Sequence, residues 1–424
     1  MTVALPRGDF ALLLTAIFAV SLGYGVVLPV LPFFLARVVG ESGSVSWHTG
    51  MLTSVYMLAI FIGAPLWGRI ADRIGRRPVI LIGLAGFSAA LLVFGFVASL
   101  WLGYAARIAG GAFAAAVLPV TLAYVSDMSV ATARARRFAW MSAASVLGFL
   151  AGPSLGGWLA GASAIGNVRA TTLPFLAAAG IGALVWLAAW QRLSEPPREP
   201  ATTANVASAP ATRLLLLLSL LVMFGLGGFE VGLTLQGQQR LGLTPGQLGL
   251  VFFECSLVMA IVEVLLFAPL AHRLEGRGTV VVAFLVMAIG VGWLTTVTGF
   301  DELWWRVGLI AASSGFLIPL LTYRISLAAG AAQAATLGAQ TAAASLGQAL
   351  GSAGTGWLFG SINESSFWVT AALLFAGALG ALAALPRHAA AARAHAEARE
   401  TKRDVLDNVD RIATDPRVTR DRAQ

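Results

Sequence analysis

Three acidic residues, Glu230, Glu254 and Glu263, lie within long apolar runs in the second half of the chain. An ionisable side chain in hydrocarbon is costly, and in membrane proteins such residues commonly mark ion or substrate pathways. Arg107 lies in another apolar run, about six residues, or roughly 9 Å, inside one boundary of its predicted helix. Burial favours the neutral form of a carboxyl, whereas a nearby arginine favours the charged form. Together these residues have the chemistry of a group that binds and releases a proton or a cation.

The predicted helix directions place two of the acids near the depth of Arg107. The helix at 213–236 should run outward and the helix at 245–270 inward, which puts Glu230 and Glu254 in the outer half of the membrane. Glu254 and Glu263 are nine residues apart and, at about 100° per residue, should face opposite sides of their helix. We therefore predict that Glu230, Glu254 and Arg107 act in proton coupling or substrate binding, and that Glu263 is structural. The alternatives are a hydrogen-bonded packing role for each acid and a snorkelling side chain for Arg107.

The elements that must position these residues are membrane-spanning helices. The 424 residues are 58% hydrophobic and only 11% charged, which is typical of a polytopic membrane protein. The N-terminal apolar run is too long for the hydrophobic region of a signal peptide, so we expect a retained first helix. Twelve helices are predicted, at 10–36, 48–67, 78–98, 101–126, 138–161, 170–191, 213–236, 245–270, 279–298, 303–323, 335–359 and 367–385.

The two halves of the chain repeat each other. Residues 148–161 align with 347–360 at a shift of 199, and Pro119 corresponds to Pro319. The fold class predicted is an all-α membrane protein with twelve transmembrane helices in two six-helix halves, an architecture in which the halves rock about a central site. The predicted parts are an N-terminal half (1–192), a cytoplasmic linker rich in Pro, Ala and Thr (193–212), a C-terminal half (213–385) and a cytoplasmic tail (386–424).

Positive charge indicates the orientation in the membrane. All but five of the 28 lysines and arginines fall in segments that the helix pattern places on one side; the exceptions are Arg37, Arg107, Arg169, Arg240 and Arg306. The positive-inside rule makes that side cytoplasmic, with both termini in the cytoplasm of a cell inner (plasma) membrane. The formal charge of +8 therefore reports orientation and needs no nucleic-acid partner.

One segment, 68–78, packs four arginines and an aspartate between two apolar runs. Charge this dense cannot lie in hydrocarbon, so we expect a short turn at the cytoplasmic surface. A second, degenerate copy carries Arg273 and Arg277 in place of Arg73 and Arg77. The segment is a candidate gating loop with these residues: Gly68, Asp72, Arg73, Gly75, Arg76 and Arg77.

A run of small residues marks the fifth predicted helix. Its pattern GxxxGPxxGG contains Gly148, Gly152, Pro153, Gly156 and Gly157. Small residues at four-residue spacing allow two helices to touch backbone to backbone, and the proline adds a kink. Polar and aromatic residues could line an amphipathic cavity, but none is singled out: Tyr24, Tyr56, Phe224, Phe229, Phe252, Phe253, Gln236, Gln238, Tyr323 and Gln340.

These motifs, taken in order, resemble the major facilitator superfamily, and in particular its twelve-helix drug/proton antiporter branch. The charged segment resembles the loop between helices 2 and 3 of that family, and the small-residue run resembles its antiporter signature. The resemblance implies that Asp72 caps a neighbouring helix terminus and pairs with arginine, closing the cytoplasmic side in the outward-facing state. It also implies a proton-coupling role for Arg107 and helix-end pairing for Asp127.

The function expected is therefore proton-coupled efflux of a small organic, drug-like molecule by alternating access, with the lipid bilayer, the substrate and protons as partners of a monomer. The alternatives are a metabolite, siderophore or lipid transporter of the same fold, including an importer, a membrane-embedded enzyme, and a transport-dead sensor. A single cysteine, four histidines without ligand spacing and a single lysine give no basis for a disulfide, a metal site or a phosphate-binding loop. We expect no catalytic residues and no cofactor beyond the proton.

Overall fold

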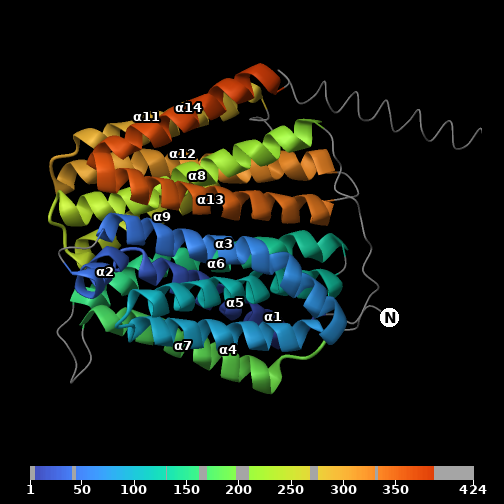
Figure 1. Cartoon of the computed structure of the whole chain (residues 1–424). Helices are drawn as coiled ribbons and strands as arrows, with labels where there is room; N and C mark the ends of the chain where they lie inside the picture. Colours follow the sequence, from blue (N-terminus) through green and yellow to red (C-terminus); the bar gives the residue numbers. More distant parts are fainter. Residues whose placement is uncertain are drawn as a thin grey trace, which may run out of the picture.

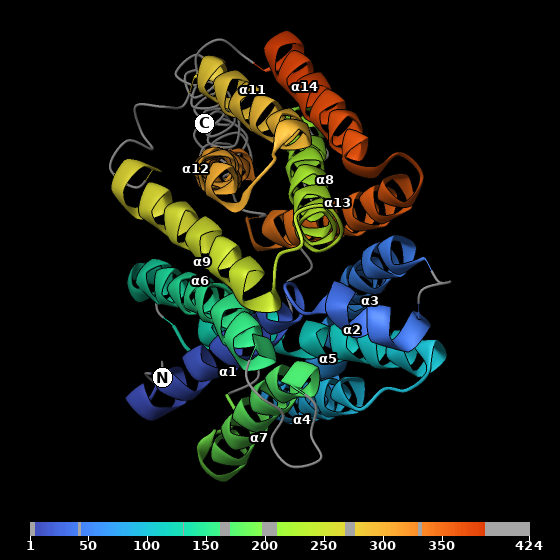
Figure 2. The same ribbon diagram turned by 90° about the vertical axis from the view of Figure 1, so that its left-hand side faces the viewer.

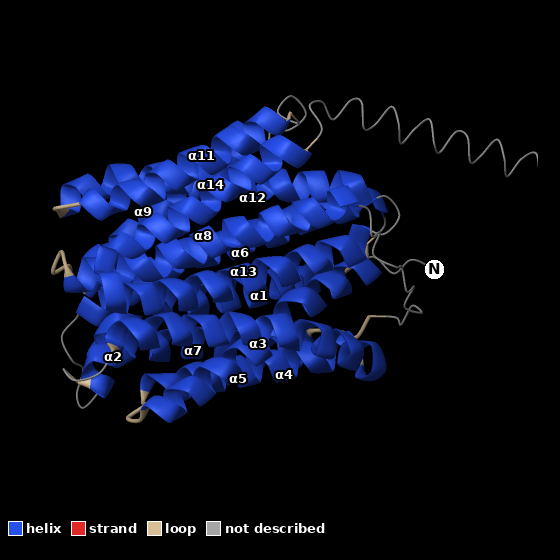
Figure 3. Cartoon of the chain, turned by 45° about the horizontal axis from the view of Figure 1, so that its top comes forward, coloured by secondary structure: helices blue, strands red, loops and turns tan. Residues whose placement is uncertain are grey.

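Long apolar helices lie side by side along one direction and make up almost all of the described chain (Figure 1, Figure 3). The computed structural model describes residues 5–40, 44–129, 131–161, 170–196, 210–267, 276–329 and 333–385. The predicted tail, 386–424, and most of the predicted linker lie outside these residues. Within them the chain has no strand, which agrees with the predicted all-α class.

The first half contains α1 to α7 and the second half α8 to α14. The helices of the first half are α1 (Arg7–Val27), α2 (Leu31–Val39), α3 (Val45–Ile74), α4 (Arg76–Gly95), α5 (Leu100–Asp127), α6 (Ala131–Gly161), η1 (Ala170–Thr172) and α7 (Leu173–Arg192). Those of the second half are α8 (Pro210–Gln239), α9 (Pro245–Ile261), η2 (Val262–Phe267), α11 (Arg277–Trp293), η3 (Leu294–Thr296), α12 (Phe300–Ala329), α13 (Gln333–Ile362), η5 (Asn363–Ser365) and α14 (Ser366–Ala384).

Eleven segments of the described chain are long and apolar enough to cross a membrane, and the last of them, Thr336–Ala384, contains both α13 and α14. Counting these two separately gives the twelve crossings expected from the sequence. Viewed from one end, the helices of the two halves gather on opposite sides of the bundle (Figure 2).

Hydroxyl side chains begin several of these helices. The Oγ of Ser44 accepts a hydrogen bond from the N–H of Trp47, and the Oγ of Ser99 accepts one from Leu102. Thr244 begins α9 with a reciprocal cap, because its side chain and that of Gln247 each bind the other's backbone N–H. These caps satisfy backbone donors that would otherwise be left unpaired at helix starts.

The prediction of one continuous first helix over 10–36 was wrong. The chain forms α1 and α2, separated by a turn at 28–30. Pro29 has no N–H and its ring obstructs helical hydrogen bonding. The tight bonds Leu28 N to Gly25 O and Val30 N to Val27 O replace the helical pattern there.

The charged segment 68–78, which we expected to form a short turn, is mostly helical. Arg69, Asp72 and Arg73 belong to the last turns of α3, and α4 begins at Arg76. The reversal takes one residue, Gly75, whose φ of 109° is accessible to glycine but not to ordinary L-residues. The two helices therefore extend further than the apolar pattern indicates, with their charged residues on the final turns.

Two seams join the halves, α3 against α13 and α6 against α9. A Cβ placed on Gly50 of α3 would lie 2.7 Å from the Cα of Gly356 in α13, and one on Gly157 of α6 would lie 2.9 Å from the Cα of Gly249 in α9. These glycines let the halves touch backbone to backbone. We call the end of the bundle with these contacts the glycine end.

The opposite end carries the turn at Gly75, and we call it the motif end. A Cβ placed on Gly68, near this end of α3, would have no heavy atom within 4 Å. The same helix is therefore tightly packed against the other half at the glycine end and has open space beside Gly68 at the motif end.

Candidate functional site

A buried carboxylate lies where the two halves meet. Glu230 of α8 accepts a hydrogen bond at Oε2 from the hydroxyl of Tyr24 in α1, at 2.9 Å. The Nε2 of Gln348 in α13 donates to the same Oε2 at 3.0 Å, and it is also 3.0 Å from the Tyr24 hydroxyl. Only 7% of Glu230 is exposed. Its charge is thus stabilised by donors from both halves of the chain.

The predicted cation is buried close to this carboxylate. Arg107 of α5 is 4% exposed and donates from Nε to the backbone oxygen of Leu52 in α3, at 3.1 Å. Its guanidinium carbon lies 4.3 Å from the centre of the Tyr56 ring. A cation over an aromatic face is stabilised by the charge distribution of the ring. The alternative of a side chain that snorkels to a surface does not fit this burial.

Aromatic rings connect Arg107 to Glu230. The rings of Tyr24 and Tyr56 lie with centroids 5.4 Å apart, and Phe149 of α6 meets Tyr24 edge-on at 5.5 Å. We define Tyr24, Tyr56, Arg107, Glu230 and Gln348 as the central cluster. The central cluster thus contains the carboxyl group of Glu230 in the second half and the guanidinium of Arg107 in the first half, with two tyrosines between them.

The other predicted acid, Glu254, does not join the central cluster through any hydrogen bond between described residues. Its Oε1 lies 3.0 Å from a Cβ placed on Gly308 of α12, and its buried Oε2 has no hydrogen-bond partner in the described chain. Glu263 lies in η2, a π-helical segment that the sequence analysis did not predict. The rotation of 100° per residue does not hold through a π-helical segment. The reasoning that placed Glu254 and Glu263 on opposite sides of one helix therefore does not apply.

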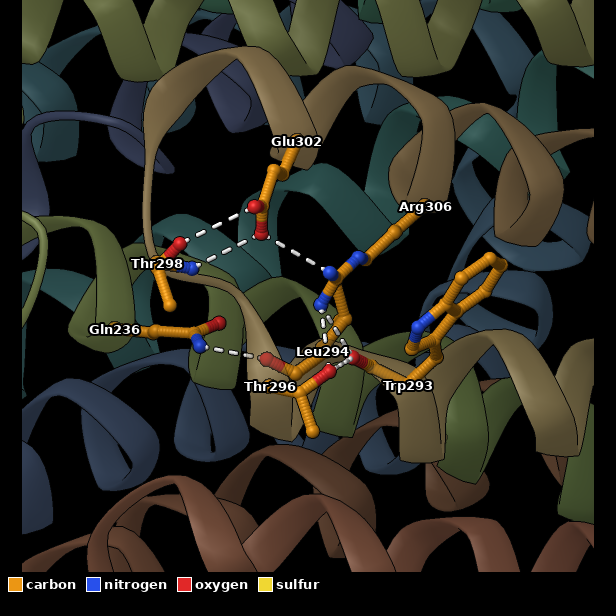
Figure 4. Close-up of polar contacts among 7 residues, drawn as sticks. All are labelled: Gln236, Trp293, Leu294, Thr296, Thr298, Glu302 and Arg306. Carbon is orange, nitrogen blue, oxygen red and sulfur yellow. Dashed lines mark hydrogen bonds and ion pairs between the residues drawn. The ribbon is translucent and has the colours of Figure 1, made fainter.

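A different polar cluster closes the turn between α11 and α12 at the glycine end (Figure 4). Arg306 donates from Nη1 to the backbone oxygen of Trp293 at 2.8 Å and to Thr296 Oγ1 at 2.9 Å, and Nη2 pairs with Glu302 at 3.0 Å. Glu302 in turn accepts from the N–H and the hydroxyl of Thr298, both at 3.2 Å. We call this group, residues 293–306, the turn clasp.

Gln236 is attached to the turn clasp rather than to the central cluster. It is buried, and its Nε2 donates to the backbone oxygen of Leu294 at 2.8 Å. The link holds the end of α8 against the turn.

At the motif end, Arg76 connects two helix ends. Its Nη1 lies 2.7 Å from Asp72 of α3, and its Nε lies 3.2 Å from Asp127 at the end of α5. Asp72 thus makes the arginine pair expected from the resemblance, and Asp127 makes a helix-end pair. Arg137 of α6 adds a bond from Nη1 to the backbone oxygen of Met128, at 2.9 Å.

Another acid at the motif end caps the N-terminus of α4. Glu195, three residues beyond α7, accepts from the N–H of Arg76 at 2.7 Å and from that of Arg77 at 2.9 Å, which are the first two amides of α4. A carboxylate is favourable at a helix N-terminus. Arg77 also donates from Nη2 to the backbone oxygen of Trp190, at 2.7 Å.

The small-residue run of α6 serves two different contacts. A Cβ on Gly148, Gly152 or Gly156 would lie 2.5–2.7 Å from the backbone oxygens of Phe18, Leu22 and Val26, all in α1. Gly157 instead meets α9, and the backbone oxygen of Pro153 also faces Gly249. Gly148, Gly152 and Gly156 therefore pack α6 against α1 within the first half. Gly157, on an adjacent face of the helix, packs α6 against α9 of the second half.

Three polar residues at these sites were not predicted from the sequence. Gln348 lies in the repeat of the small-residue run, but its facing could not be predicted from spacing. Glu195 follows the last apolar residue of α7, and Asp9 precedes the main apolar run of α1. Asp9 is buried and accepts hydrogen bonds from Tyr124 and from the hydroxyl of Ser194. A signal for these last two acids was their position at helix ends, where carboxylates can cap or pair.

Comparison with known proteins gives the same class as the fold and the motifs. The sequence profile of the Major Facilitator Superfamily matches residues 13–337. The chain belongs to the Major Facilitator Superfamily. It is a membrane transporter and not an enzyme.

Two relatives match most of the chain. Multidrug resistance protein 2 of Bacillus subtilis (strain 168) is 30% identical over 361 residues, which cover 82% of this chain and 88% of the relative. Quinolone resistance protein NorA of Staphylococcus aureus is 25% identical over 375 residues, covering 85% of this chain and 92% of the relative.

Solved structures share the fold. A bacterial homolog of the human lysosomal transporter Spinster, in an inward-facing and occupied conformation, has a TM-score of 0.76 at 16% identity and covers 89% of this chain and 97% of that one. The human organic anion transporter MFSD10 (TETRAN) has a TM-score of 0.67 at 20% identity, covering 88% and 99%.

Proposed function

We propose that this chain exports a small organic, drug-like molecule in exchange for protons. The names of its relatives support the substrate class, because two of them are described as multidrug and quinolone resistance proteins. The observation that carries the proposal is the Glu230 carboxylate, which is buried and hydrogen-bonded to both halves of the chain. A group in this position can exchange a proton for a substrate while its contacts change between two conformations.

The exchange would use alternating access, in which the halves rock about the central cluster. The glycine contacts of the seams support one state of that cycle, closed at the glycine end. We assign the motif end to the cytoplasm, since Arg69, Arg73, Arg76 and Arg77 all lie there. In this orientation we take the structure to be an inward-facing carrier, and the open space beside Gly68 at the motif end agrees with that state.

The remaining features of the proposal follow from the same orientation. The chain would reside in the inner (plasma) membrane with both termini cytoplasmic, act as a monomer, and need no cofactor beyond the transported proton. Its halves would be 1–192 and 213–385, with a cytoplasmic linker at 193–212 and a cytoplasmic tail at 386–424. The gating residues would be those of the motif end, with Asp72, Arg76 and Asp127 exchanging partners as that end closes.

The side chains of the central cluster and Phe149 support an amphipathic substrate. Tyr24, Tyr56 and Phe149 supply aromatic surface beside one carboxylate and one guanidinium. The apolar surface of such a site can bind an aromatic molecule, and its carboxylate can pair with a positive charge on that molecule.

The experiment is reconstitution of the full chain in liposomes that contain a pH-sensitive dye, with an imposed proton gradient and a panel of lipophilic cations and neutral drugs. We expect substrate-dependent proton movement in the natural sequence and its loss in Glu230→Gln, which keeps the shape of the side chain but cannot carry the proton. Glu254→Gln measures the share of the second acid, and Glu302→Gln, an exposed carboxylate far from the central cluster, is the matched control. Natural rates in Glu230→Gln would contradict the assignment of the carrier.

A further inference from the structure

We infer that Tyr24 and Gln348 enforce the coupling of transport, because they latch the empty, deprotonated Glu230 across the two halves and so prevent the unloaded carrier from reorienting. The inference rests on the proposed function, since it concerns the same carboxylate. It gives a role to two side chains that carry no charge.

The latch is a closed set of three hydrogen bonds. The Tyr24 hydroxyl has one proton and donates it to Glu230 Oε2, at 2.9 Å. The Gln348 amide has two protons, one directed at the same Oε2 and one at the Tyr24 hydroxyl, each at 3.0 Å. Every donor in the set is used, and Oε2 is an acceptor for two of them. The set therefore leaves no place for a proton on Oε2, and a proton that binds Glu230 while the set is intact must reside on Oε1.

Two of these bonds connect the halves. Tyr24 lies on α1 of the first half, whereas Glu230 and Gln348 lie on α8 and α13 of the second half. Any movement that separates α1 from α8 must break the bond to the carboxylate and the bond from Gln348. Because Tyr24 and Glu230 are buried and Gln348 is half-buried, few solvent partners are at hand to replace the lost bonds.

The strength of the latch depends on what Glu230 carries. A hydrogen bond to a carboxylate is roughly twice as strong as one between neutral groups, so a proton on Glu230 weakens both bonds that it accepts. A substrate that engages Oε2 displaces the donors outright. The ionisable groups that face the cluster from other helices are Tyr56 of α3, Arg107 of α5 and Cys255 of α9, and none of them supplies a second carboxylate in contact with Oε2 that could substitute for Glu230.

This behaviour is what an exchanger requires. If the carrier could turn outward while empty, it would take up a proton outside, turn back and release the proton inside, and the gradient would drain without export. A ligand shifts a conformational equilibrium only by as much as it binds the two states differently. The latch supplies that difference, since the empty, charged carboxylate receives both bonds at full strength in the inward-facing state, whereas the protonated group receives weaker bonds and the substrate-bound group loses them.

The test is Tyr24→Phe in the full chain reconstituted in liposomes. The substitution removes the hydroxyl and keeps the ring that packs on Tyr56 and Phe149. The probe is an imposed proton gradient with no substrate present, and the readout is the rate at which the internal pH changes. We expect this leak to rise roughly tenfold to a hundredfold, the factor that corresponds to losing one hydrogen bond to a charged acceptor. Gln348→Met, which keeps the length but removes both donors, should raise it as well.

A matched control breaks a different bond between the halves. Ser46 of α3 and Gln239 of α8 are joined by a hydrogen bond of 3.2 Å that involves no ionisable group. Liposomes with Ser46→Ala should therefore show the same rate of proton leak as liposomes with the natural chain. The double variant Tyr24→Phe with Glu230→Gln should also be tight, because a carrier without the carboxylate cannot transport the leaking protons.

The outcomes separate the inference from the function on which it rests. Absence of substrate-dependent proton movement in the natural chain would refute the proposed exchange. Normal exchange with no leak in both Tyr24→Phe and Gln348→Met would refute the latch and leave the exchange standing. A leak that persists in the double variant would show a hole in the packing rather than turnover of the carrier, and would also refute the latch.

Discussion

Arg107 and Arg306 lie 199 residues apart, the shift that relates the two halves, on the corresponding helices α5 and α12. Each lies over an aromatic ring and donates to a backbone oxygen, but they differ in burial and in ion pairing. Arg107 is buried against the face of Tyr56, and no carboxylate lies within ion-pair distance among the described residues. Arg306 is paired with Glu302 and closes the turn after α11 (Figure 4).

The difference shows how a duplicated chain can divide two tasks. In the second half the arginine satisfies the backbone oxygen of Trp293 at the end of α11, a position where positive charge is favourable. In the first half the corresponding arginine has no bond to a turn, and it lies over Tyr56 in the central cluster. The first arginine is thus available for function, and the second is committed to structure.

The sharpest test of this comparison is the same substitution at both positions. Arg107→Lys should lower substrate-dependent proton movement by roughly tenfold to a hundredfold, the factor for one lost hydrogen bond of a charged group. A lysine keeps the charge but cannot donate from Nε to Leu52 and also lay a planar face on Tyr56. The measurement is the initial rate in liposomes, at equal amounts of inserted protein.

Arg306→Lys is the control for that experiment. It should transport at close to the natural rate, because the turn clasp lies outside the central cluster. If both variants lose transport equally, the proposed division of tasks between the halves is wrong.

The next effect concerns the aromatic partner of Arg107. Tyr56→Leu removes the ring beneath the guanidinium, an interaction of about 0.5–2 kcal/mol. We expect transport to fall by a smaller factor than in Arg107→Lys. Trp293→Leu, which removes the ring 5.2 Å from the Arg306 guanidinium carbon, should leave transport unchanged. A larger loss in Trp293→Leu than in Tyr56→Leu would reverse the comparison.

Arg306→Ala should affect stability rather than transport. The substitution deletes the bonds to Trp293 and Thr296 together with the pair to Glu302, and we expect the free energy of unfolding to fall by about 1–3 kcal/mol. Thermal unfolding of the purified protein in detergent measures the change. An unchanged midpoint would mean that the turn is held by other contacts, such as the bond from Gln236 to Leu294.

Much of the fold could be predicted from sequence because apolar length and small-residue spacing are local properties of the chain. The positions of the twelve crossings and the backbone contacts of Gly148 and Gly152 follow from them. The split at Pro29 and the single-residue reversal at Gly75 could not be placed, since the energy of a proline or glycine break depends on what neighbouring helices offer to the freed groups.

The candidate site could be predicted only in part. Depth along the helices predicted Glu230 and Arg107 at the same level, and the structure links them through two neighbouring tyrosines, Tyr24, which donates to Glu230, and Tyr56, which lies under Arg107. The same reasoning grouped Glu254 with Glu230, because depth does not determine which way a side chain faces. Gln348 was missed for the same reason: rotation of a helix about its axis is set by packing, which no single apolar run records.

The smallest effect that we expect is on stability, when the ion pair of Arg306 in the turn clasp loses its charge. Glu302→Gln loses the charge, but its amide oxygen can still accept from the Thr298 N–H and from Arg306, and its amide can donate to the Thr298 hydroxyl. The glutamate side chain is 47% exposed, where water screens ion pairs and their worth is below about 1 kcal/mol. We expect a small decrease in the unfolding midpoint, less than for Arg306→Ala, that shrinks further at high salt, with natural transport. A decrease as large as that of Arg306→Ala would show that the clasp depends on the ion pair rather than on the arginine's bonds to the backbone.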